Sequence, residues 1–475
     1  MQNVSEHLSV VPVTPQPLER FAAILDTDQY HRFVAAAEGA RELLVGRVVW
    51  NINSTALGGG VVEMLRSLLP FATGAGVDAR WLVIHAGPEF FRLTKRIHNQ
   101  LHGAPGDGGD LGPAERTLYE EVLRTHAEAL QAVVGPRDIV VLHDPQTAGL
   151  VPAVHRLGAK VIWRCHVGAD EPSPLVHRAL DFLRPYVEQA DAYVFTRLAY
   201  AWEGLPPANI VFIPPSIDAF SPKNQVLSSE QVSGILSATG IVEGTLGRTT
   251  FVRLDGSAGQ VIRRADLLGG SPVPEGGRIV TQVSRWDRLK DPLGVINGFL
   301  AHVADRRDVH LVIAGPAVAA VSDDPEGLGV VNEARALWER LAPEIRERVH
   351  LVCLPMDDID ENAAMVNALQ RRASVVVQKS LAEGFGLTVA EAMWKARPIV
   401  ASRVGGIQDQ LIDGESGVLV AATDLVAYGR AVMALLDDPS RATRLGNAAE
   451  RRCREEYLAP RHLLHYIALL QKLLA

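Results

Sequence analysis

The sequence predicts an α/β protein divided into two units, each built around a parallel β-sheet. Short apolar runs alternate with longer stretches of helical composition, which is the pattern of repeated βαβ units. In two places, at residues 47–69 and 374–396, a strand leads into a glycine-rich turn and then into a helix. The chain has 475 residues, which is enough for two domains with separate hydrophobic cores.

Composition and charge argue against several classes of protein. Hydrophobic residues make up 47% of the chain and charged residues 21%, as in ordinary globular α/β proteins. The net charge of -8 argues against a nucleic-acid-binding protein, which needs a basic surface. No apolar run approaches the roughly 18 residues of a membrane-spanning helix, and the first residues, with Glu6 and Glu19, do not resemble a signal peptide. The three widely spaced cysteines show no metal-ligand spacing, so we expect reduced thiols in a cytoplasmic protein.

A first unit is predicted over residues 1–222, beginning with an extended arm and a helix. Its strands are expected at residues 47–53, 80–85, 138–143, 160–166, 192–195 and 210–213. Its clearest later helices are expected at residues 61–69 and 114–134, with a loop at residues 103–113. Ligands of a parallel sheet sit beyond the carboxyl ends of its strands. His143, Asp144, Arg164 and His166 lie at such ends. Any one of them could be structural, but four converging polar residues favour a site.

A second unit is predicted over residues 278–458, after a linker and insertion at residues 223–277. Within the linker, residues 251–262 predict a hairpin around Asp255 and Gly256. The strands of the second unit are expected at residues 278–284, 309–315, 349–354 and 374–378. Its helices are expected at residues 387–396, 424–437 and 440–456, followed by a final amphipathic helix at residues 459–475.

The most informative stretch joins the last of these strands to the helix that follows it. Gly384 and Gly386 allow the backbone to bend sharply and to approach a ligand closely. The helix start offers free N–H groups and a positive dipole end, which suit a phosphate, and Thr388 can add a hydroxyl. Glu383 lies in the turn, and Glu391 lies far enough into the helix to accept two vicinal sugar hydroxyls. Two glutamates in a plain surface turn are the alternative, but the whole pattern favours a sugar-nucleotide site.

The other glycine turn lies at residues 54–60. It does not match G-x-G-x-x-G, and no acidic residue completes a dinucleotide fingerprint, so an oxidoreductase is not supported. A glycine triplet by itself could also be a tight turn that contacts no ligand. Because a second phosphate-type turn occurs later in the chain, we expect Gly59 and Gly60 to contact the ligand.

The stretch from Glu383 to Glu391 resembles the E-x7-E signature of retaining glycosyltransferases of family 4, which have the GT-B fold. The flanking residues 395–407 and 413–420 resemble the same family. Further segments resemble its branch of trehalose glycosyltransferring synthases, namely residues 53–64, 90–95, 143–146, 163–166, 214–218, 281–287, 323–327 and 384–394. An extra segment near residues 243–274 departs from the family pattern.

The resemblance implies two Rossmann-like domains that face each other across a cleft. Residues 1–222 would bind the acceptor and residues 278–458 the nucleotide sugar, with the helix at 459–475 packing back on the first domain. The implied reaction joins glucose from a nucleoside-diphosphate glucose, such as ADP- or UDP-glucose, to free glucose, forming α,α-trehalose reversibly and with retention. A retaining trehalose phosphorylase and a family-4 hexosyltransferase with another small acceptor are the alternatives. A non-catalytic sugar-sensing module is disfavoured because the charged residues of the site are all present.

The resemblance also implies roles for individual residues. Glu383 would hold the donor glucose and support positive charge at its anomeric carbon, with His166 beside that glucose. Arg285 and Lys290 would neutralise the diphosphate in place of a metal ion, although an isolated pair of this kind is usually solvated surface charge. Donor-binding residues would be Gly59, Gly60, Gly384, Phe385, Gly386, Leu387, Thr388 and Glu391. Acceptor-binding residues would be Asn53, Phe90, Lys95, Asp144 and Arg164.

The resemblance also bears on metal ions, cofactors and partners. Asp358 and Asp360 form a D-x-D sequence that could suggest a metal, but we interpret it as a helix cap because the fold needs no metal. No cofactor is expected, since the nucleoside-diphosphate glucose is a substrate. The expected partners are therefore nucleotide sugar, glucose and trehalose, with no nucleic acid and no membrane. The oligomeric state stays open, with a homodimer among the options.

Overall fold

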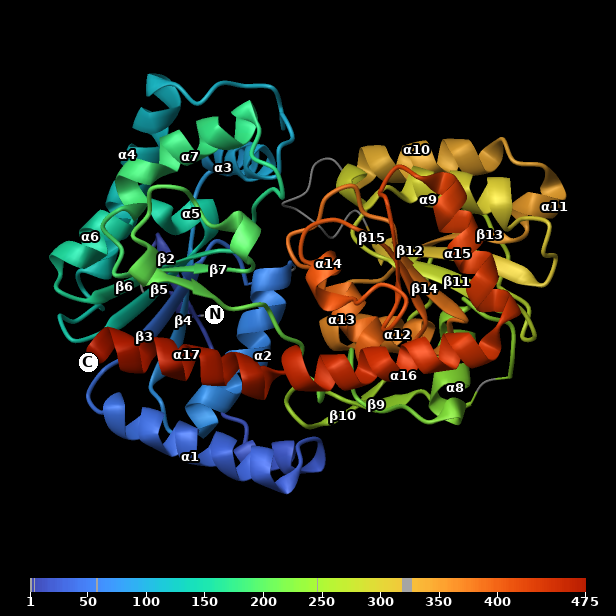
Figure 1. Cartoon of the computed structure of the whole chain (residues 1–475), viewed down its shortest axis with the longest axis horizontal. Helices are drawn as coiled ribbons and strands as arrows, with labels where there is room; N and C mark the ends of the chain where they lie inside the picture. Colours follow the sequence, from blue (N-terminus) through green and yellow to red (C-terminus); the bar gives the residue numbers. More distant parts are fainter. Residues whose placement is uncertain (1, 4, 57–58, 246, 318–326) are drawn as a thin grey trace. The chain divides into compact units, whose positions relative to one another are not determined.

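The computed structural model describes residues 2–3, 5–56, 59–245, 247–317 and 327–475, which form two compact units (Figure 1). Unit 1 consists of residues 1–216 together with residues 458–475, and unit 2 consists of residues 217–457. Both units are α/β, which confirms the predicted fold class. Leu57 and Gly58 of the first glycine turn lie outside the described residues, as do residues 323–326 of the family-like segments.

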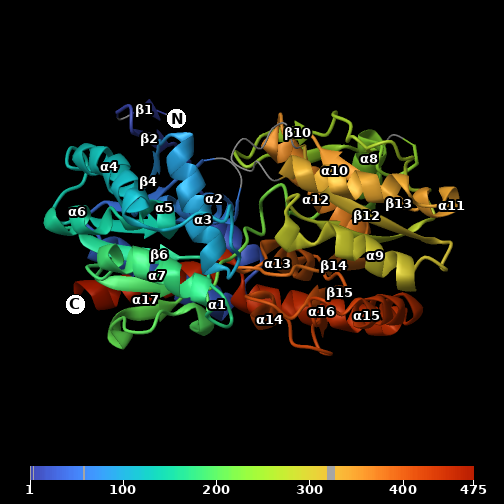
Figure 2. The same ribbon diagram turned by 90° about the horizontal axis from the view of Figure 1, so that it is seen from above.

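Unit 1 is built on an eight-stranded sheet with the strand order β1-β2-β4-β3-β5-β6-β7-β8. The strands are β1 (Gln2–Asn3), β2 (Leu8–Val11), β3 (Val49–Asn53), β4 (Ala79–Ile84), β5 (Ile139–His143), β6 (Lys160–Cys165), β7 (Ala192–Phe195) and β8 (Ile210–Phe212). From β4 to β8 every neighbouring pair is parallel, whereas β1 and β2 add an antiparallel edge beside the N-terminus (Figure 2). All six predicted strands of this unit are present.

Helices cover both faces of this sheet, and its central strands are therefore buried on both sides. On β3, Trp50 and Ile52 belong to one core and Val49 to the other, as the twofold alternation of a strand requires. The first face carries α3 (Pro88–Leu101), α4 (Pro113–Leu130), α5 (Asp144–Ala148), α6 (Val151–Arg156) and α7 (Pro174–Val187). The second carries α1 (Thr27–Leu43), α2 (Gly60–Gly74) and α17 (Ala459–Leu474). Within the described residues, the unit also has the 3-10 helices η1 (Leu18–Ala23), η2 (Leu198–Tyr200) and η3 (Pro207–Asn209).

The last helix, α17, belongs to unit 1 although it follows all of unit 2 in the sequence. Its residues Leu469 and Leu470 are buried with Leu44, Val49 and Val141, and it packs against α1 and α2 (Figure 1). Burial of this apolar stripe fixes the amphipathic helix on the second face of the unit 1 sheet.

Unit 2 is built on a six-stranded, fully parallel sheet with the order β13-β12-β11-β14-β15-β16. The strands are β11 (Arg278–Val283), β12 (Val309–Pro316), β13 (Val349–Leu354), β14 (Val375–Gln378), β15 (Ile399–Ser402) and β16 (Val418–Val420). One core lies under α9 (Pro292–His302), α10 (Gly327–Glu339) and α15 (Leu425–Asp437). The other lies under α8 (Ser229–Thr239) and α12 (Ile359–Arg372). The remaining helices are η4 (Arg288–Lys290), α11 (Pro343–Arg346), α13 (Leu387–Trp394), α14 (Ile407–Gln410) and α16 (Pro439–Glu456).

Residues 223–277 differ from the predicted linker, because the structure makes them part of unit 2. Helix α8 packs against α12, and the predicted hairpin forms between β9 (Thr250–Val252) and β10 (Ala258–Gln260). Phe251 and Val261 are buried in the same core, and the loops around them make ion pairs with α12. Apolar burial therefore turns the segment into an additional cover of the sheet, and the unit boundary falls at residue 216 rather than 222.

Asp358 has a structural role at the start of α12. Its carboxylate accepts hydrogen bonds from the backbone N–H groups of Asp360 and Glu361, and it pairs with Arg253 of the hairpin. The Arg253 hydrogen bond lowers the pKa of Asp358 to about 2. The D-x-D sequence is thus a helix cap, and no group of three or more His, Cys, Asp or Glu side chains within the described ranges could hold a metal ion.

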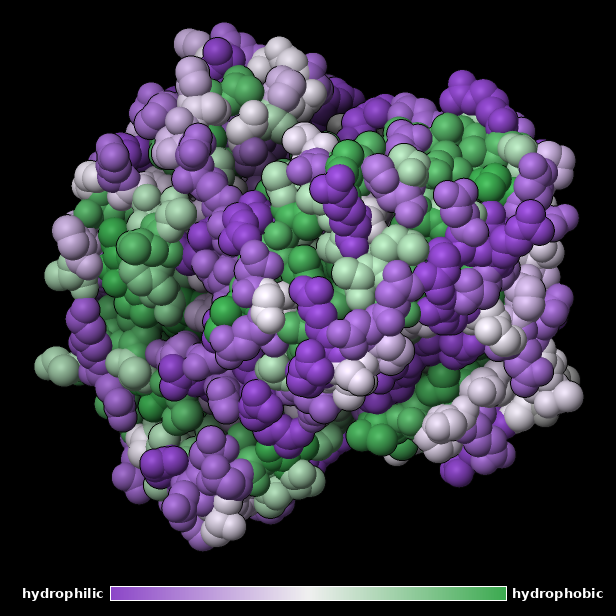
Figure 3. Space-filling view, turned by 45° about the vertical axis from the view of Figure 1, so that its right-hand side comes forward, coloured by the Kyte–Doolittle hydropathy of each residue, from purple (hydrophilic) through white to green (hydrophobic). Residues whose placement is uncertain are grey.

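On the face seen in Figure 3, hydrophobic residues are interspersed among hydrophilic ones. None of the helices in the described part of the chain has both the length and the apolar character needed to cross a membrane.

Candidate active site

The topology of unit 2 marks one end of its sheet as the place for a ligand. Strands β12 and β13 lie on one side of β11, whereas β14, β15 and β16 lie on the other. The loops that leave β11 and β14 therefore diverge, and open α/β sheets bind ligands at such a switch point. The loop after β11 carries Arg285 and Lys290, and the loop after β14 carries Glu383. Residues separated by about a hundred positions are brought together by adjacent parallel strands.

Lys290 and Glu383 form a direct ion pair at this switch point. The Lys290 Nζ lies 2.6 Å from the Glu383 Oε2, and the two side chains are only 16% and 11% exposed. The Ser380 hydroxyl is 3.3 Å from the same carboxylate oxygen. A charge-assisted hydrogen bond of this kind fixes both side chains. The site therefore presents a positive and a negative group side by side, suited to charges of opposite sign that develop on neighbouring atoms.

Arg285 lies on the same loop but is more open to solvent. Its Nη2 is 3.6 Å from the Asp287 carboxylate, and its side chain is 40% exposed. The guanidinium therefore lies on the same loop as Lys290 and is open to solvent.

The glycine turn after β14 has the conformation that its sequence predicted. Gly386 has a φ of +90° and caps the N-terminus of α13, where Leu387 is the first helical residue. Phe385 is buried and packs edge-on against Tyr457, with 5.6 Å between the ring centroids. A Cβ atom on Gly406 would lie 2.7 Å from the Phe385 Cα, so a second glycine is needed for the turn to pack. The turn backbone beside Gly384 is consequently fixed in place, because Gly406 donates a hydrogen bond to the Gly384 carbonyl.

Thr388 and Glu391 are more enclosed than the sequence suggested. The Thr388 hydroxyl donates to the Gln378 Oε1 at 2.9 Å, so its proton is already engaged. The Glu391 side chain is 2% exposed, and its Oε1 is 3.6 Å from the Lys223 Nζ. Lys395 donates to the Glu391 carbonyl from a buried position, and burial lowers the pKa of Lys395 to about 7. Glu391 therefore lies in a buried charged cluster behind the turn.

Three residues that the sequence analysis did not select hold the two loops together. Gln282 is fully buried at the end of β11. Its Nε2 donates to the Lys290 carbonyl at 2.7 Å, and its Oε1 accepts from the Lys379 N–H at 2.9 Å. The Lys379 ammonium is buried and pairs with Asp291, which caps α9. The sequence did contain a sign of this role, because Gln282 and Lys379 are polar residues at the ends of otherwise apolar strands.

Unit 1 has a corresponding switch point between β3 and β5. Strand β4 lies on one side of β3, and strands β5 to β8 lie on the other. Asn53 ends β3 and His143 ends β5. In the turn after β3, Gly59 has a φ of +85° and caps α2, which begins at Gly60, and both glycines are exposed. Exposed backbone at a helix start is where a phosphate or a sugar can approach.

His166 lies in a buried network at this end of the unit 1 sheet. Its Nε2 is 3.0 Å from the Arg164 Nε and 3.1 Å from the His143 Nδ1. The two imidazole rings stack with 5.4 Å between centroids. Burial lowers the pKa of His166 and of His143 well below the ordinary histidine value, and the Arg164 charge lowers both further. Both rings are therefore neutral at pH 7.

Asp144 supports His166 from the start of α5. Its backbone has a φ of +62°, a conformation that is uncommon for residues other than glycine. Its Oδ1 accepts a hydrogen bond from the His166 N–H at 2.7 Å. Burial raises the pKa of Asp144 to about 7, against the opposing effects of that hydrogen bond and of Arg164. Asp144 thus orients the loop that carries His166.

The other expected acceptor residues of unit 1 differ in accessibility. Asn53 is buried, donates to the Thr55 carbonyl and accepts from the Trp81 Nε1. Phe90 is 1% exposed in the core, where it stacks on Tyr119. Arg164 is likewise 1% exposed. Lys95, in the same part of the chain as Phe90, is half-buried on α3. Asn53, Phe90 and Arg164 are therefore placed to support the residues around the predicted acceptor site from within the core.

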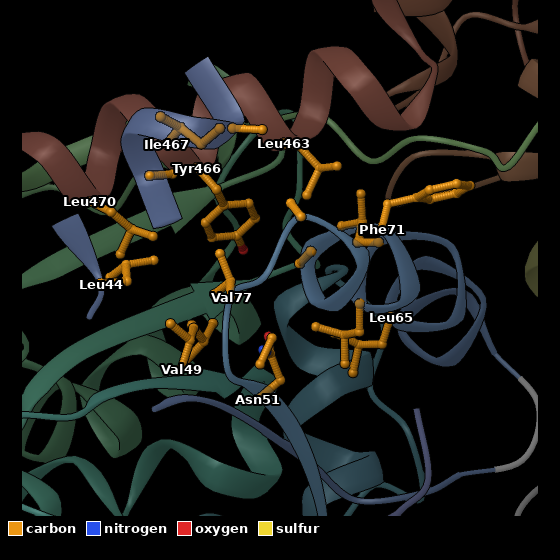
Figure 4. A pocket seen from close by; sticks show the side chains of 18 of the residues that line it. Leu44, Val49, Asn51, Leu65, Phe71, Val77, Leu463, Tyr466, Ile467 and Leu470 are labelled. Carbon is orange, nitrogen blue, oxygen red and sulfur yellow. The ribbon is translucent and has the colours of Figure 1, made fainter. Parts of the chain in front are cut away.

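A cavity of about 90 Å³ in unit 1 lies under α1, α2 and α17 (Figure 4), and two of its lining residues, Asn51 and Tyr466, contact His143 and Arg164. Its lining is apolar except for Asn51 and Tyr466. A sugar nucleotide carries charges and many hydroxyl groups, which such a lining cannot hydrogen-bond. The cavity is therefore not a substrate site.

Comparisons with known proteins find matches over both units. A family described as "Trehalose synthase, N-terminal domain" matches residues 51–202, and "Glycosyl transferases group 1" matches residues 265–452. The chain is 37% identical over 447 residues to a trehalose synthase of Rubrobacter xylanophilus, covering 92% of this chain and 94% of that protein. It is 27% identical over 409 residues to a trehalose phosphorylase of Grifola frondosa, covering 81% of this chain and 52% of that protein.

A solved structure supports the fold independently. The structure described as "Trehalose-6-phosphate from E. coli bound with UDP-2-fluoro glucose" matches with a TM-score of 0.67 at 11% identity, covering 89% of this chain and 99% of that one. At this identity the likeness concerns the fold alone, and it assigns the two Rossmann-like units to the GT-B class. Both family matches and the identity over nearly the whole chain lead to one assignment: the chain belongs to the trehalose synthase family of glycosyltransferases.

Proposed function

We propose that the protein transfers glucose from a nucleoside-diphosphate glucose to free glucose and forms α,α-trehalose with retention at the donor carbon. The observation that carries the proposal is the Lys290–Glu383 pair at the switch point of unit 2. The similarity to a trehalose synthase over 92% of the chain supports the choice of product. In this proposal unit 2 holds the nucleotide sugar, and unit 1 holds the acceptor glucose.

The charges of the pair match those of the reaction. As the bond between the glucose anomeric carbon and the diphosphate oxygen breaks, negative charge grows on the diphosphate and positive charge on the sugar. Lys290, helped by Arg285, would stabilise the diphosphate, and Glu383 would stabilise the sugar. Because both charges grow only as the bond breaks, these contacts favour the transition state over bound substrate.

Retention follows from attack on the face that the diphosphate leaves. The acceptor hydroxyl oxygen forms the new bond to the anomeric carbon, and its proton passes to the departing diphosphate oxygen. The products are then trehalose and a nucleoside diphosphate, with no atom unaccounted for. In unit 1, the neutral His166 would lie beside the transferred glucose, held by Asp144.

The cationic loop also supports transfer without a metal ion. Arg285 and Lys290 occupy the loop after β11 and supply two positive charges, which is the role that a divalent ion serves at many diphosphate sites. We therefore propose that neither a metal ion nor a cofactor takes part.

A second candidate is a retaining trehalose phosphorylase. The similarity to the Grifola frondosa trehalose phosphorylase favours it as the alternative. Inorganic phosphate would then occupy the place of the nucleoside diphosphate beside Lys290. Two incubations of trehalose separate the candidates, one with inorganic phosphate and one with a nucleoside diphosphate. A phosphorylase predicts a glucose phosphate in the phosphate mixture. The main proposal predicts no reaction there and a sugar nucleotide in the nucleoside-diphosphate mixture.

Product analysis tests the main proposal directly. Purified protein is incubated with ADP-, UDP- or GDP-glucose and with glucose, and the products are identified by NMR. The expected result is α,α-trehalose and the matching nucleoside diphosphate from at least one donor. Omitting glucose serves as the control for donor hydrolysis. No trehalose from any of the three donors would refute the proposal.

A further inference from the structure

Hydrogen bonds tie the loop after β11 to the loop after β14 around Lys290. The Leu381 N–H donates to the Leu289 carbonyl at 2.7 Å. The Gln282 Nε2 donates to the Lys290 carbonyl at 2.7 Å, and the Gln282 Oε1 accepts from the Lys379 N–H at 2.9 Å. Because these bonds involve main-chain atoms of residues 289 and 290, they hold the backbone that carries the Lys290 side chain.

A buried ion pair holds the next residue, Asp291. Its Oδ2 pairs with the Lys379 ammonium, and the Asp291 and Lys379 side chains are 19% and 2% exposed. Its Oδ1 accepts from the Gly294 N–H at 3.0 Å and caps α9. A Cβ atom on Gly294 would collide with the Asp291 carboxylate, so a glycine at that position leaves room for it. One carboxylate thus links the β14 loop to the start of α9.

Asp291 also sets the direction in which the chain leaves Lys290. Its φ of +49° and ψ of +52° lie in the left-handed region, where aspartate and asparagine occur more often than most residues. Lys290 ends the short helix η4, and Pro292 begins α9, so this one residue turns the chain between the two helices. The ion pair with Lys379 and the helix cap together fix the Asp291 side chain. Lys379 therefore acts on the position from which the Lys290 side chain extends.

Stability alone does not account for the Lys379–Asp291 pair. Removing two charges from water is costly, and a buried ion pair often contributes no more than apolar side chains of similar shape. The two loops are in addition already joined by Gln282 and by the Leu381 N–H. What the pair adds is a fixed place for Asp291, the residue directly after Lys290.

We infer that Lys379 and Asp291 are positioning residues for the reaction: their ion pair fixes the turn after Lys290 and so places the Lys290 ammonium. In this position the Lys290 Nζ lies 2.6 Å from the Glu383 Oε2. A displacement of about 1 Å in a reacting group can lower a rate about 100-fold, so a small shift of the turn would be felt in turnover. The inference rests on the proposed function, because that function gives the Lys290 ammonium its role at the diphosphate.

Three variants of the full chain test the inference. Asp291→Asn keeps the capping oxygen and a residue type that adopts positive φ readily, but it removes the charge that Lys379 faces. Lys379→Met keeps an unbranched apolar stem and removes the ammonium. The double variant removes both charges and leaves neither one unpaired. It therefore separates loss of the link between the loops from burial of a lone charge.

Arg348→Met is the matched control. Arg348 is a buried cation, 9% exposed, that donates to the Ala304 and Arg306 carbonyls at 2.7 and 3.0 Å. It joins separate segments of unit 2, as Lys379 does. It directly precedes β13, at the amino end of the sheet, whereas Lys379 follows β14 at the carboxyl end, where the site lies.

Trehalose formation gives kcat and the KM values for donor and glucose, and thermal unfolding gives Tm. Both single variants should lower kcat about 10- to 100-fold and lower Tm, with KM values near wild type because the Lys290 contact strengthens in the transition state. The double variant should regain Tm while its kcat stays low. Arg348→Met should lower Tm and leave kcat near wild type. In a Lys290→Ala background, Asp291→Asn should lower kcat less than about twofold further, because residues that act as one unit have non-additive effects.

A measurement without substrate keeps the inference separate from the proposed function. Urea unfolding of Lys290→Ala, of Glu383→Gln and of their combination gives the coupling between these two side chains. If the Lys379–Asp291 pair places Lys290, that coupling should fall by about half or more in the Asp291→Asn background and stay unchanged in the Arg348→Met background.

Wild-type kcat in both single variants would overturn the inference. So would a kcat that recovers together with Tm in the double variant, or one that Asp291→Asn lowers equally with and without Lys290. If wild type forms no trehalose, the proposed function fails, and the unfolding measurement still decides whether the pair places Lys290: an unchanged coupling in Asp291→Asn shows that it does not. Should a single variant fail to fold, the double variant carries both tests.

Discussion

Removing the ammonium of Lys290 is predicted to have two separable effects, one on stability and one on turnover. Lys290 is paired with Glu383 at 2.6 Å, so Lys290→Ala removes the ammonium partner of the carboxylate. In the transition state the same ammonium faces the leaving diphosphate, according to the proposed mechanism. A double-mutant cycle with Glu383→Gln separates the two effects, because the amide no longer attracts the ammonium.

The size of the stability effect follows from the exposure of the pair. The side chains are 16% and 11% exposed, so the pair lies between the surface and the deep interior. Two unit charges about 4 Å apart attract by about 4 kcal/mol at an effective dielectric constant of about 20. Desolvation of both groups opposes this attraction, which leaves a coupling of about 1–3 kcal/mol. Lys290→Ala should therefore lower the free energy of unfolding by about that amount in the wild-type background, and by less in Glu383→Gln.

Turnover should respond more strongly than stability. Loss of one preorganised electrostatic partner typically lowers kcat by about 10²–10³-fold, and we expect this for Lys290→Ala and for Glu383→Gln. Glu383→Gln should leave the affinity for free nucleoside diphosphate nearly unchanged, since the nucleotide does not contact that charge in the proposed mechanism. The assays are urea unfolding, steady-state kinetics with donor and glucose, and calorimetric titration of the nucleoside diphosphate.

Arg288 provides a matched control on the same short helix. Its guanidinium pairs with Glu333 at the surface, and its side chain is 59% exposed. Exposed pairs contribute about 0–1 kcal/mol, so Arg288→Ala should change stability little and leave kcat near wild type. A coupling below about 0.5 kcal/mol in the cycle, together with wild-type turnover of Glu383→Gln, would show that the pair is a structural feature and that the chemistry lies elsewhere.

Three further predictions concern metal ions, nucleotide affinity and pH. If Arg285 and Lys290 neutralise the diphosphate, trehalose formation should survive EDTA; complete loss that magnesium or manganese restores would contradict this. Glu391→Gln should weaken nucleoside-diphosphate binding about tenfold in calorimetry, through a lost hydrogen bond from the ribose to a charged group, and unchanged affinity would remove Glu391 from the site. Asp144 has a folded pKa of about 7, above its ordinary value of 3.8, so the folded state binds more protons between about pH 4 and pH 7 and loses stability as pH rises through that window. Asp144→Asn, which cannot ionise, should therefore gain about 1 kcal/mol or more over wild type in urea unfolding between about pH 5 and pH 8, and an equal difference at both pH values would be inconsistent with this.

The sequence alone was sufficient for those features that depend on neighbouring residues. Strand and helix composition is a local signal, so it predicted most of the parallel strands of both sheets. The turn at Gly386 was predicted correctly because only glycine readily adopts its left-handed conformation. The choice of Lys290 and Glu383 also began with local position, since each follows a strand whose carboxyl end points to the ligand side of the sheet.

Only the tertiary structure decided which of these groups meet and which are enclosed. The Lys290–Glu383 pair depends on β11 lying beside β14, and the bridging amide of Gln282 depends on the same adjacency. The segment at residues 223–277 was predicted to be a linker and insertion, but its residues Phe251 and Val261 meet a core formed by distant strands. Phe90 and Arg164 are buried by elements far from them in sequence. Burial and long-range hydrogen bonds arise from the topology of the whole chain, which no local pattern of residues encodes.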